Sequence, residues 1–171
     1  MLSSELVKPI GEREDDVGRD EEVGTTETTE TPRSGMIAIP GSGESAATAT
    51  QRVLLAEDEY LLAAQMEQWL TEAGHEVVGI VSSADAAIEF AERSRPNIVI
   101  MDVKLAGHRD GVYAAEQIYS SLGIRSLFSS AYGDDWTRLR ALPTKPLGWL
   151  GKPYGRTEFL RAVGRAIDQL E

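Results

Sequence analysis

The 171-residue sequence contains no cysteine and is short of positive charge. The missing cysteine excludes disulfide bonds, thiolate metal sites and a cysteine nucleophile, which suits a reducing compartment. Lysine and arginine number 17 against 28 acidic residues, for a net charge of −11. No basic stripe interrupts this charge, so nucleic acid and anionic membranes are poor partners. Because no apolar run could cross a membrane and residues 1–20 lack the apolar core of a signal peptide, we expect a cytoplasmic protein.

Aromatic residues are absent from the first part of the chain. Residues 1–50 contain 11 acidic and 4 basic side chains but no Trp, Tyr or Phe. Without large apolar side chains, this segment cannot offset the entropy lost on ordering. We therefore expect an acidic, disordered extension over residues 1–50 and one domain over residues 51–171. Residues 36–46 imitate a strand and a dinucleotide-binding glycine turn, but the residues that follow are too few and too polar for the helix that such a motif requires.

From Arg52 onward, apolar runs of strand length alternate with segments of helical period. This alternation is typical of βα repeats around a parallel sheet. It predicts an α/β fold of the flavodoxin-like, doubly wound type, with five parallel strands and helices on both faces. The fourth helix should be short or irregular, because Pro143 and Pro146 interrupt it. The predicted strands are 53–56, 76–81, 97–101, 124–128 and 148–151, and the predicted helices begin near residues 59, 83, 110, 134 and 157.

Four of the predicted strands end in side chains that suit one chemistry. Asp102 follows the central apolar run, and the other strand ends carry an acidic pair, a pair of serines and a lysine. In a parallel sheet the carboxyl ends of all strands lie along one edge, so these side chains should converge in one crevice. They are Glu57, Asp58, Asp102, Ser129, Ser130 and Lys152.

This set of side chains predicts a phosphoryl site. Carboxylate oxygens from Glu57, Asp58 and Asp102 are ligands that Mg²⁺ prefers. An acyl phosphate on Asp102 would add negative charge, which the cation and Lys152 would balance, and Ser130 could bond a phosphoryl oxygen. The residues specify a carboxylate nucleophile that gains a phosphoryl group and later loses it to water. They do not specify the donor.

The same motifs resemble the receiver domains of two-component response regulators. The likeness is carried, in order, by Arg52–Glu59, Pro96–Asp102, Ser130–Ala131 and Lys152–Pro153, and it covers residues 52–171. The resemblance implies that Asp102 is the phospho-acceptor and that Glu57, Asp58, Asp102 and the backbone carbonyl of Lys104 bind Mg²⁺. It further implies that Lys152 binds phosphate, that Ser130 is the switch hydroxyl and that Trp149 is the switch aromatic.

The sequence departs from the commonest receiver pattern at several positions. Glu57 stands where aspartate is more usual, Ser130 replaces threonine, and Trp149 replaces tyrosine or phenylalanine. Each replacement keeps the functional group that the position needs. The segment Phe128–Gly133 is similar to the Phe-Ala-Thr-Gly-Tyr-Gly motif of single-domain alphaproteobacterial receivers, with matches at its first, fifth and sixth positions.

The resemblance implies a stand-alone bacterial signalling protein rather than an enzyme. Asp102 would accept phosphate from a sensor histidine kinase, and the domain would signal through an unknown downstream protein or a phosphotransferase, as a monomer or weak dimer. The last predicted helix ends at Leu170, so we expect no output domain in this chain.

Two alternatives belong to other functional classes. The first is a binding module with the same fold that acts without phosphorylation. The second is a hydrolase that forms an aspartyl phosphate. It would be expected to carry a second acid two residues beyond Asp102, where this chain has Lys104.

Overall fold

The computed structural model describes residues 49–131 and 134–170, which form an α/β domain. Except for its last two residues, the predicted acidic extension lies outside the described residues, as does the glycine turn at residues 36–46. The extension therefore stays a prediction.

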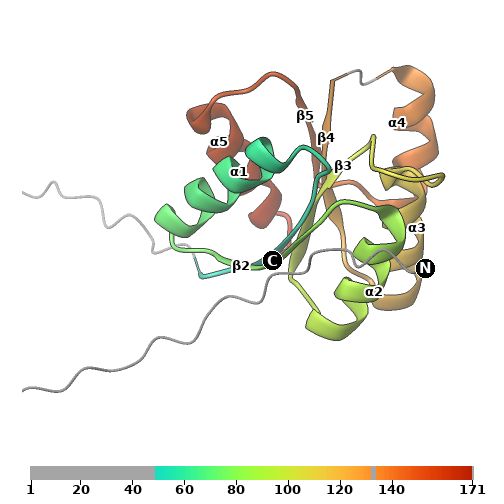
Figure 1. Ribbon diagram of the computed structural model, residues 1–171, viewed down its shortest axis with the longest axis horizontal. Helices are drawn as coiled ribbons and strands as arrows, with labels where there is room; N and C mark the ends of the chain where they lie inside the picture. Colours follow the sequence, from blue (N-terminus) through green and yellow to red (C-terminus); the bar gives the residue numbers. More distant parts are fainter. Residues whose placement is uncertain (1–48, 132–133, 171) are drawn as a thin grey trace, which may run out of the picture. The chain divides into compact units, whose positions relative to one another are not determined.

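A parallel five-stranded sheet forms the centre of the domain (Figure 1). Its strand order is β2-β1-β3-β4-β5, which confirms the predicted doubly wound fold. The strands are β1 (Arg52–Ala56), β2 (Glu76–Val81), β3 (Ile98–Asp102), β4 (Ser126–Ser130) and β5 (Gly148–Gly151). The helices are α1 (Tyr60–Glu72), α2 (Ala84–Ser94), α3 (Gly111–Leu122), α4 (Asp135–Ala141) and α5 (Arg156–Ile167), and a 3₁₀ turn, η1 (Leu142–Thr144), follows α4.

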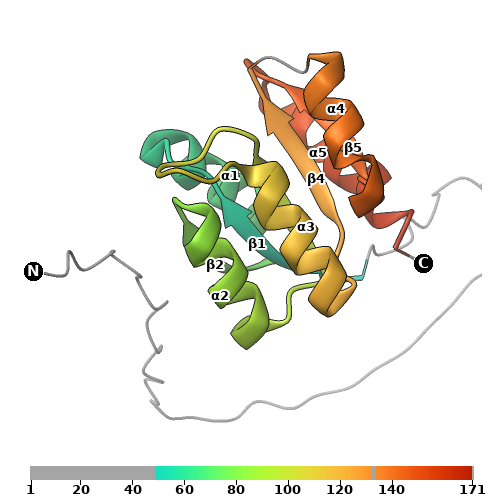
Figure 2. The same cartoon turned by 90° about the vertical axis from the view of Figure 1, so that its right-hand side faces the viewer.

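Helices cover both faces of the sheet, so the core has two layers (Figures 1 and 2). Helices α1 and α5 pack on one face, around Met66 and Phe159, while α2, α3 and α4 pack on the other, around Ile118 and Phe128. Strands β3 and β4 are buried along their whole length. Burial on both faces explains why the central strand reads as a continuous apolar run rather than as an alternating pattern.

Side-chain caps fix where three helices begin. Ser83 accepts a hydrogen bond from the N–H of Ala86 at the start of α2, close to the predicted start of that helix at residue 83. Asp110 caps α3 and Asp134 caps α4 in the same way. Because the cap of α3 follows directly on the loop after β3, it also fixes the end of that loop.

The fourth helix is short, as predicted, but Pro143 does not simply end it. The α-helix stops at Ala141 and the chain continues as η1, with Pro143 in its first turn. Proline is tolerated there because the first N–H groups of a helix have no intrahelical acceptor. Strand β4 also differs from the prediction, since it begins two residues later and includes both serines.

Gly111, the first residue of α3, packs against the backbone of Asp102. A Cβ atom at this position would overlap the backbone carbonyl oxygen of Asp102, and backbone cannot move aside as a flexible side chain can. We expect Gly111→Ala to lower the free energy of unfolding by about 3 kcal/mol. Gly164→Ala in α5, where a Cβ would meet nothing within 4 Å, should instead stabilise the domain slightly. Urea unfolding of both variants tests the difference, and equal stability would contradict this packing.

Candidate functional site

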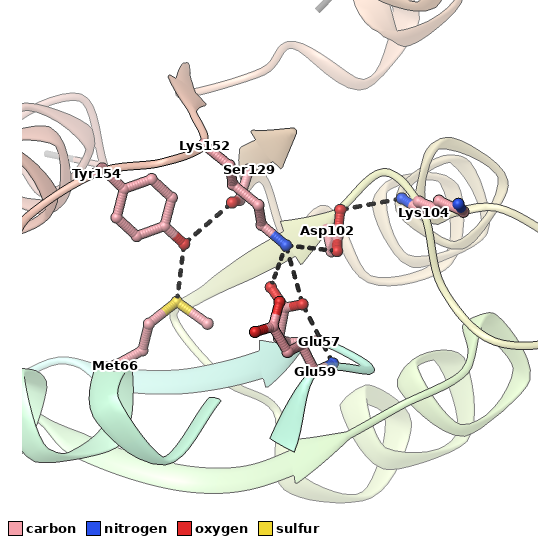
Figure 3. Close-up of polar contacts among 8 residues, drawn as sticks. All are labelled: Glu57, Glu59, Met66, Asp102, Lys104, Ser129, Lys152 and Tyr154. Carbon is pink, nitrogen blue, oxygen red and sulfur yellow. Dashed lines mark hydrogen bonds and ion pairs between the residues drawn. The ribbon is translucent and has the colours of Figure 1, made fainter. Parts of the chain in front are cut away.

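Three carboxyl groups, from Glu57, Asp58 and Asp102, meet at the carboxyl edge of the sheet. Figure 3 shows two of them, Glu57 and Asp102, together with Lys152. Asp102 is the last residue of β3, while Glu57 and Asp58 directly follow β1, the neighbouring strand. Each of the three residues offers one carboxylate oxygen, and these oxygens lie within 4.8 Å of one another. Glu57 and Asp102 are buried, whereas Asp58 is exposed. The cluster is therefore open to solvent on the Asp58 side.

Lys152 closes the cluster from the segment after β5. Its Nζ lies 2.7 Å from Oε2 of Glu57 and 2.7 Å from Oδ2 of Asp102. The other oxygen of Asp102 accepts a hydrogen bond from the N–H of Lys104, at 3.0 Å. Burial acts to lower the pKa of Lys152, but its hydrogen bonds to Asp102 and Glu57 outweigh burial, so the pKa is raised. Lys152 therefore stays charged between the two acids.

Glu57 is the acid of this cluster whose pKa is clearly shifted. Burial raises the pKa of Glu57 from 4.5 to about 7, and the charge of Asp102 adds to the rise, while Lys152 opposes it. One lysine thus compensates two buried carboxylates only in part. The residual negative charge favours a further cation.

The raised pKa of Glu57 has a measurable effect on stability. The folded protein holds this proton more tightly than the unfolded chain does, so its contribution to stability is complete below pH 4.5 and is lost as the pH rises through about 7. In metal-free buffer, Glu57→Gln should therefore lose less stability than the unsubstituted protein between about pH 5 and about pH 8. Urea unfolding at both pH values measures this, and parallel losses would contradict the assignment.

The cluster matches the chemistry of Mg²⁺. All three donors are carboxylate oxygens, and the exposed side next to Asp58 leaves room for the waters that Mg²⁺ usually retains. Glu57, Asp58 and Asp102 therefore fit a hard divalent cation. The proposed role of the Lys104 carbonyl stays a prediction.

The two predicted switch residues lie on adjacent strands, β4 and β5. Ser130 is buried at the end of β4, and its carbonyl accepts a hydrogen bond from the N–H of Lys152 at 2.9 Å. Trp149 is half-buried in β5 and stacks on Phe128, with ring centroids 4.7 Å apart. The guanidinium of Arg138, from α4, lies 5.0 Å from the centre of the Trp149 ring. Trp149 thus joins the core of the sheet to α4.

Two hydrogen-bonded pairs around the site were not predicted from the sequence. Arg140 of α4 bonds Asp110 through both ends of its guanidinium, with a shortest distance of 2.7 Å. Tyr154 and Ser129 share a hydrogen bond of 3.1 Å. Each pair joins residues at least 25 positions apart, so no local spacing indicates it. Strand alternation alone could have shown that Ser129 faces away from its neighbour Ser130.

Within residues 49–131 and 134–170, no helix is both long and apolar enough to cross a membrane.

Comparison with known proteins places this geometry in a family. The family model described as the response regulator receiver domain matches residues 53–164. The transcriptional regulatory protein PdtaR of Mycobacterium tuberculosis is 33% identical over 72% of this chain, and the phyllosphere-induced regulator PhyR of Methylorubrum extorquens is 26% identical over 72%. The matched regions make up 60% and 46% of those two proteins, so the chain spans only part of their length.

Solved structures agree with this assignment. The signal receiver domain of a modulated diguanylate cyclase from Desulfovibrio desulfuricans has a TM-score of 0.65 and 30% identity, and the match covers 71% of this chain and 96% of that one. The response regulator PhyR from Brucella abortus has a TM-score of 0.62 and 29% identity, over 71% of this chain and 49% of that one. The resemblance inferred from the four motifs is confirmed, and the chain belongs to the response regulator receiver domain family.

Proposed function

We propose that this protein is a phospho-accepting signal receiver, in which Asp102 takes a phosphoryl group from a sensor histidine kinase in a Mg²⁺-dependent reaction. One observation supports this above all: Asp102 lies between two further acids and a lysine at the carboxyl edge of the sheet. Its relatives PdtaR and PhyR are named as regulators, which agrees with a role in signalling. The proposed output is binding to a downstream protein, or transfer of the phosphate to a phosphotransferase.

The proposed transfer follows from the groups present. A carboxylate oxygen of Asp102 attacks the phosphorus, an oxygen–phosphorus bond forms, and the nitrogen–phosphorus bond of the phosphohistidine breaks with its electron pair left on the imidazole. Lys152 already lies 2.7 Å from Asp102, so its positive charge stands beside the incoming phosphoryl oxygens. Glu57, Asp58 and Asp102 would hold Mg²⁺, which supplies charge neutralisation for the transferred group when bound.

The proposed response is a shift between two conformations of one domain. After phosphorylation Ser130 would approach the phosphoryl oxygens, and Trp149 would move with it from its position over Phe128. Arg138 would then lose its contact with the Trp149 ring, and the surface formed by α4, β5 and α5 would change. A population shift of this kind needs only about 3 to 5 kcal/mol of differential stabilisation.

Tryptophan fluorescence can follow this response. The chain has three tryptophans: Trp69 is buried under α5, Trp136 is exposed on α4, and Trp149 stacks on Phe128. With Mg²⁺ and beryllofluoride, a phosphoryl mimic, we expect a change in emission that Trp149→Phe removes and the matched variant Trp136→Phe retains. If both variants responded like the unsubstituted protein, Trp149 would not be the reporter of the switch.

A further inference from the structure

The hydroxyls of Ser129 and Tyr154 lie next to the acidic cluster, on the α1 and α5 side of the sheet (Figure 3). The Oγ of Ser129 lies 3.1 Å from the phenol oxygen of Tyr154, which lies 3.3 Å from the sulfur of Met66 in α1. Both contacts are satisfied when Ser129 donates to Tyr154 and Tyr154 donates to Met66. Ser129 is 1% exposed, so without Tyr154 its hydroxyl would lose a partner where solvent does not reach.

The ring of Tyr154 has contacts of its own, in addition to those of its hydroxyl. It stacks on Phe159 of α5, with centroids 5.8 Å apart and planes at 20°. Phe159 in turn contacts Trp69 of α1, at 5.5 Å between centroids. Tyr154 is therefore fixed to α1, α5 and β4 together, although it lies in the loop between β5 and α5.

This anchoring bears on Lys152, two residues earlier in the chain. The N–H of Lys152 bonds the carbonyl of Ser130, and Tyr154 bonds Ser129, so the segment is attached to β4 at two successive residues. A lysine side chain is long and flexible, and its ammonium has no fixed geometry of its own. The position of Nζ over Glu57 and Asp102 therefore depends on how rigidly the backbone around Lys152 is held.

We propose that Tyr154 and Ser129 form a positioning pair, which holds Lys152 over Glu57 and Asp102 for phosphoryl transfer. The inference rests on the proposed function, because it gives these two residues a part in the same reaction. Neither residue touches the reacting atoms. They act through the backbone of the segment that carries the lysine.

Substituting either residue of the pair should slow phosphorylation as much as substituting both. In Tyr154→Phe or Ser129→Ala, the segment loses its second attachment to β4, and we expect the maximal rate of phosphorylation by acetyl phosphate to fall about three- to tenfold. The half-saturating concentration of acetyl phosphate should stay unchanged, because Lys152 acts on the transferred group rather than on the rest of the donor. The double variant should be no slower than the slower single variant, since both substitutions remove the same hydrogen bond.

A spectroscopic measurement tests the same point without any phosphodonor. The chain has only four lysines, at positions 8, 104, 145 and 152, so their side-chain ammonium groups can be assigned by NMR. The ammonium of Lys152, held by two buried carboxylates, should give a slowly exchanging signal that broadens or vanishes in Tyr154→Phe. The matched control is Tyr119→Phe on α3, which packs on the opposite face of the sheet. This variant should change neither the Lys152 signal nor the rate of phosphorylation.

The outcomes separate the inference from the function on which it rests. A broadened Lys152 signal with the predicted loss of rate supports the positioning pair. An unchanged Lys152 signal and an unchanged maximal rate in Tyr154→Phe would overturn the inference while leaving the phospho-acceptor role intact. Failure of the unsubstituted protein to take up phosphate would overturn the proposed function itself, and with it the part that the inference assigns to the pair.

Discussion

Replacing Lys152 with methionine is expected to lower the free energy of unfolding by about 3 kcal/mol in metal-free buffer, because it leaves two buried acids without their cation. The side chains of Glu57 and Asp102 are only 1% and 7% exposed, so solvent cannot take over the role of the ammonium. Methionine keeps most of the volume of the lysine stem, which limits the packing loss. The variant therefore isolates the electrostatic contribution.

Added Mg²⁺ should restore much of that stability but not the chemistry. A divalent cation at Glu57, Asp58 and Asp102 would compensate the same carboxylates, whereas the charge beside the phosphoryl group would still be missing. Guanidinium unfolding with Mg²⁺ and with EDTA measures the first effect, and the rate of phosphorylation measures the second. Lys145→Met, at an exposed lysine, is the control and should change neither. A Lys152→Met protein as stable as the control in EDTA would contradict the electrostatic account.

Replacing Asp102 with asparagine is expected to abolish phosphorylation while the domain stays folded. The amide fills the same space, but it is not a nucleophile toward phosphorus and it carries one negative charge less. Loss of that charge also removes one of the causes that raise the pKa of the neighbouring Glu57. The fold should therefore tolerate the change.

The comparison for this variant is Asp85→Asn, at an exposed aspartate paired with Arg109 on the surface. Both variants should unfold cooperatively, and only Asp102→Asn should fail to gain mass with Mg²⁺ and acetyl phosphate. Phosphorylation of Asp102→Asn at the normal rate would show that the acceptor is another residue.

Most of the fold could be predicted from the sequence, because its strands and helices differ sharply in hydrophobic period. The bounds of β2 and β5 match the prediction residue for residue. The prediction for β4 began at Ile124, but the strand begins at Ser126, where pairing with Val99 of β3 starts. Apolar character cannot fix such an end, because the polar residues Ser129 and Ser130 are buried through partners distant in sequence.

The candidate site could be predicted to a similar extent, and for a physical reason. Parallel strands bring their carboxyl ends to one edge, so the residues at or just after the ends of β1, β3 and β5 had to meet there. The structure brings Glu57, Asp58, Asp102 and Lys152 together as expected. Contacts made around this edge were not predictable, because they depend on how loops and α4 pack. Tyr154 on Ser129 and Arg140 on Asp110 are the two examples.

The most direct measurement is to locate the phosphate on the unsubstituted protein. The full chain is incubated with acetyl phosphate in Mg²⁺ or in EDTA, its intact mass is recorded, and borohydride then converts any aspartyl phosphate to homoserine for peptide mapping. We predict one phosphate per chain, formed only with Mg²⁺, and homoserine at position 102. No gain in mass by the folded protein, or homoserine at another aspartate, would contradict the claim that Asp102 is the phospho-acceptor.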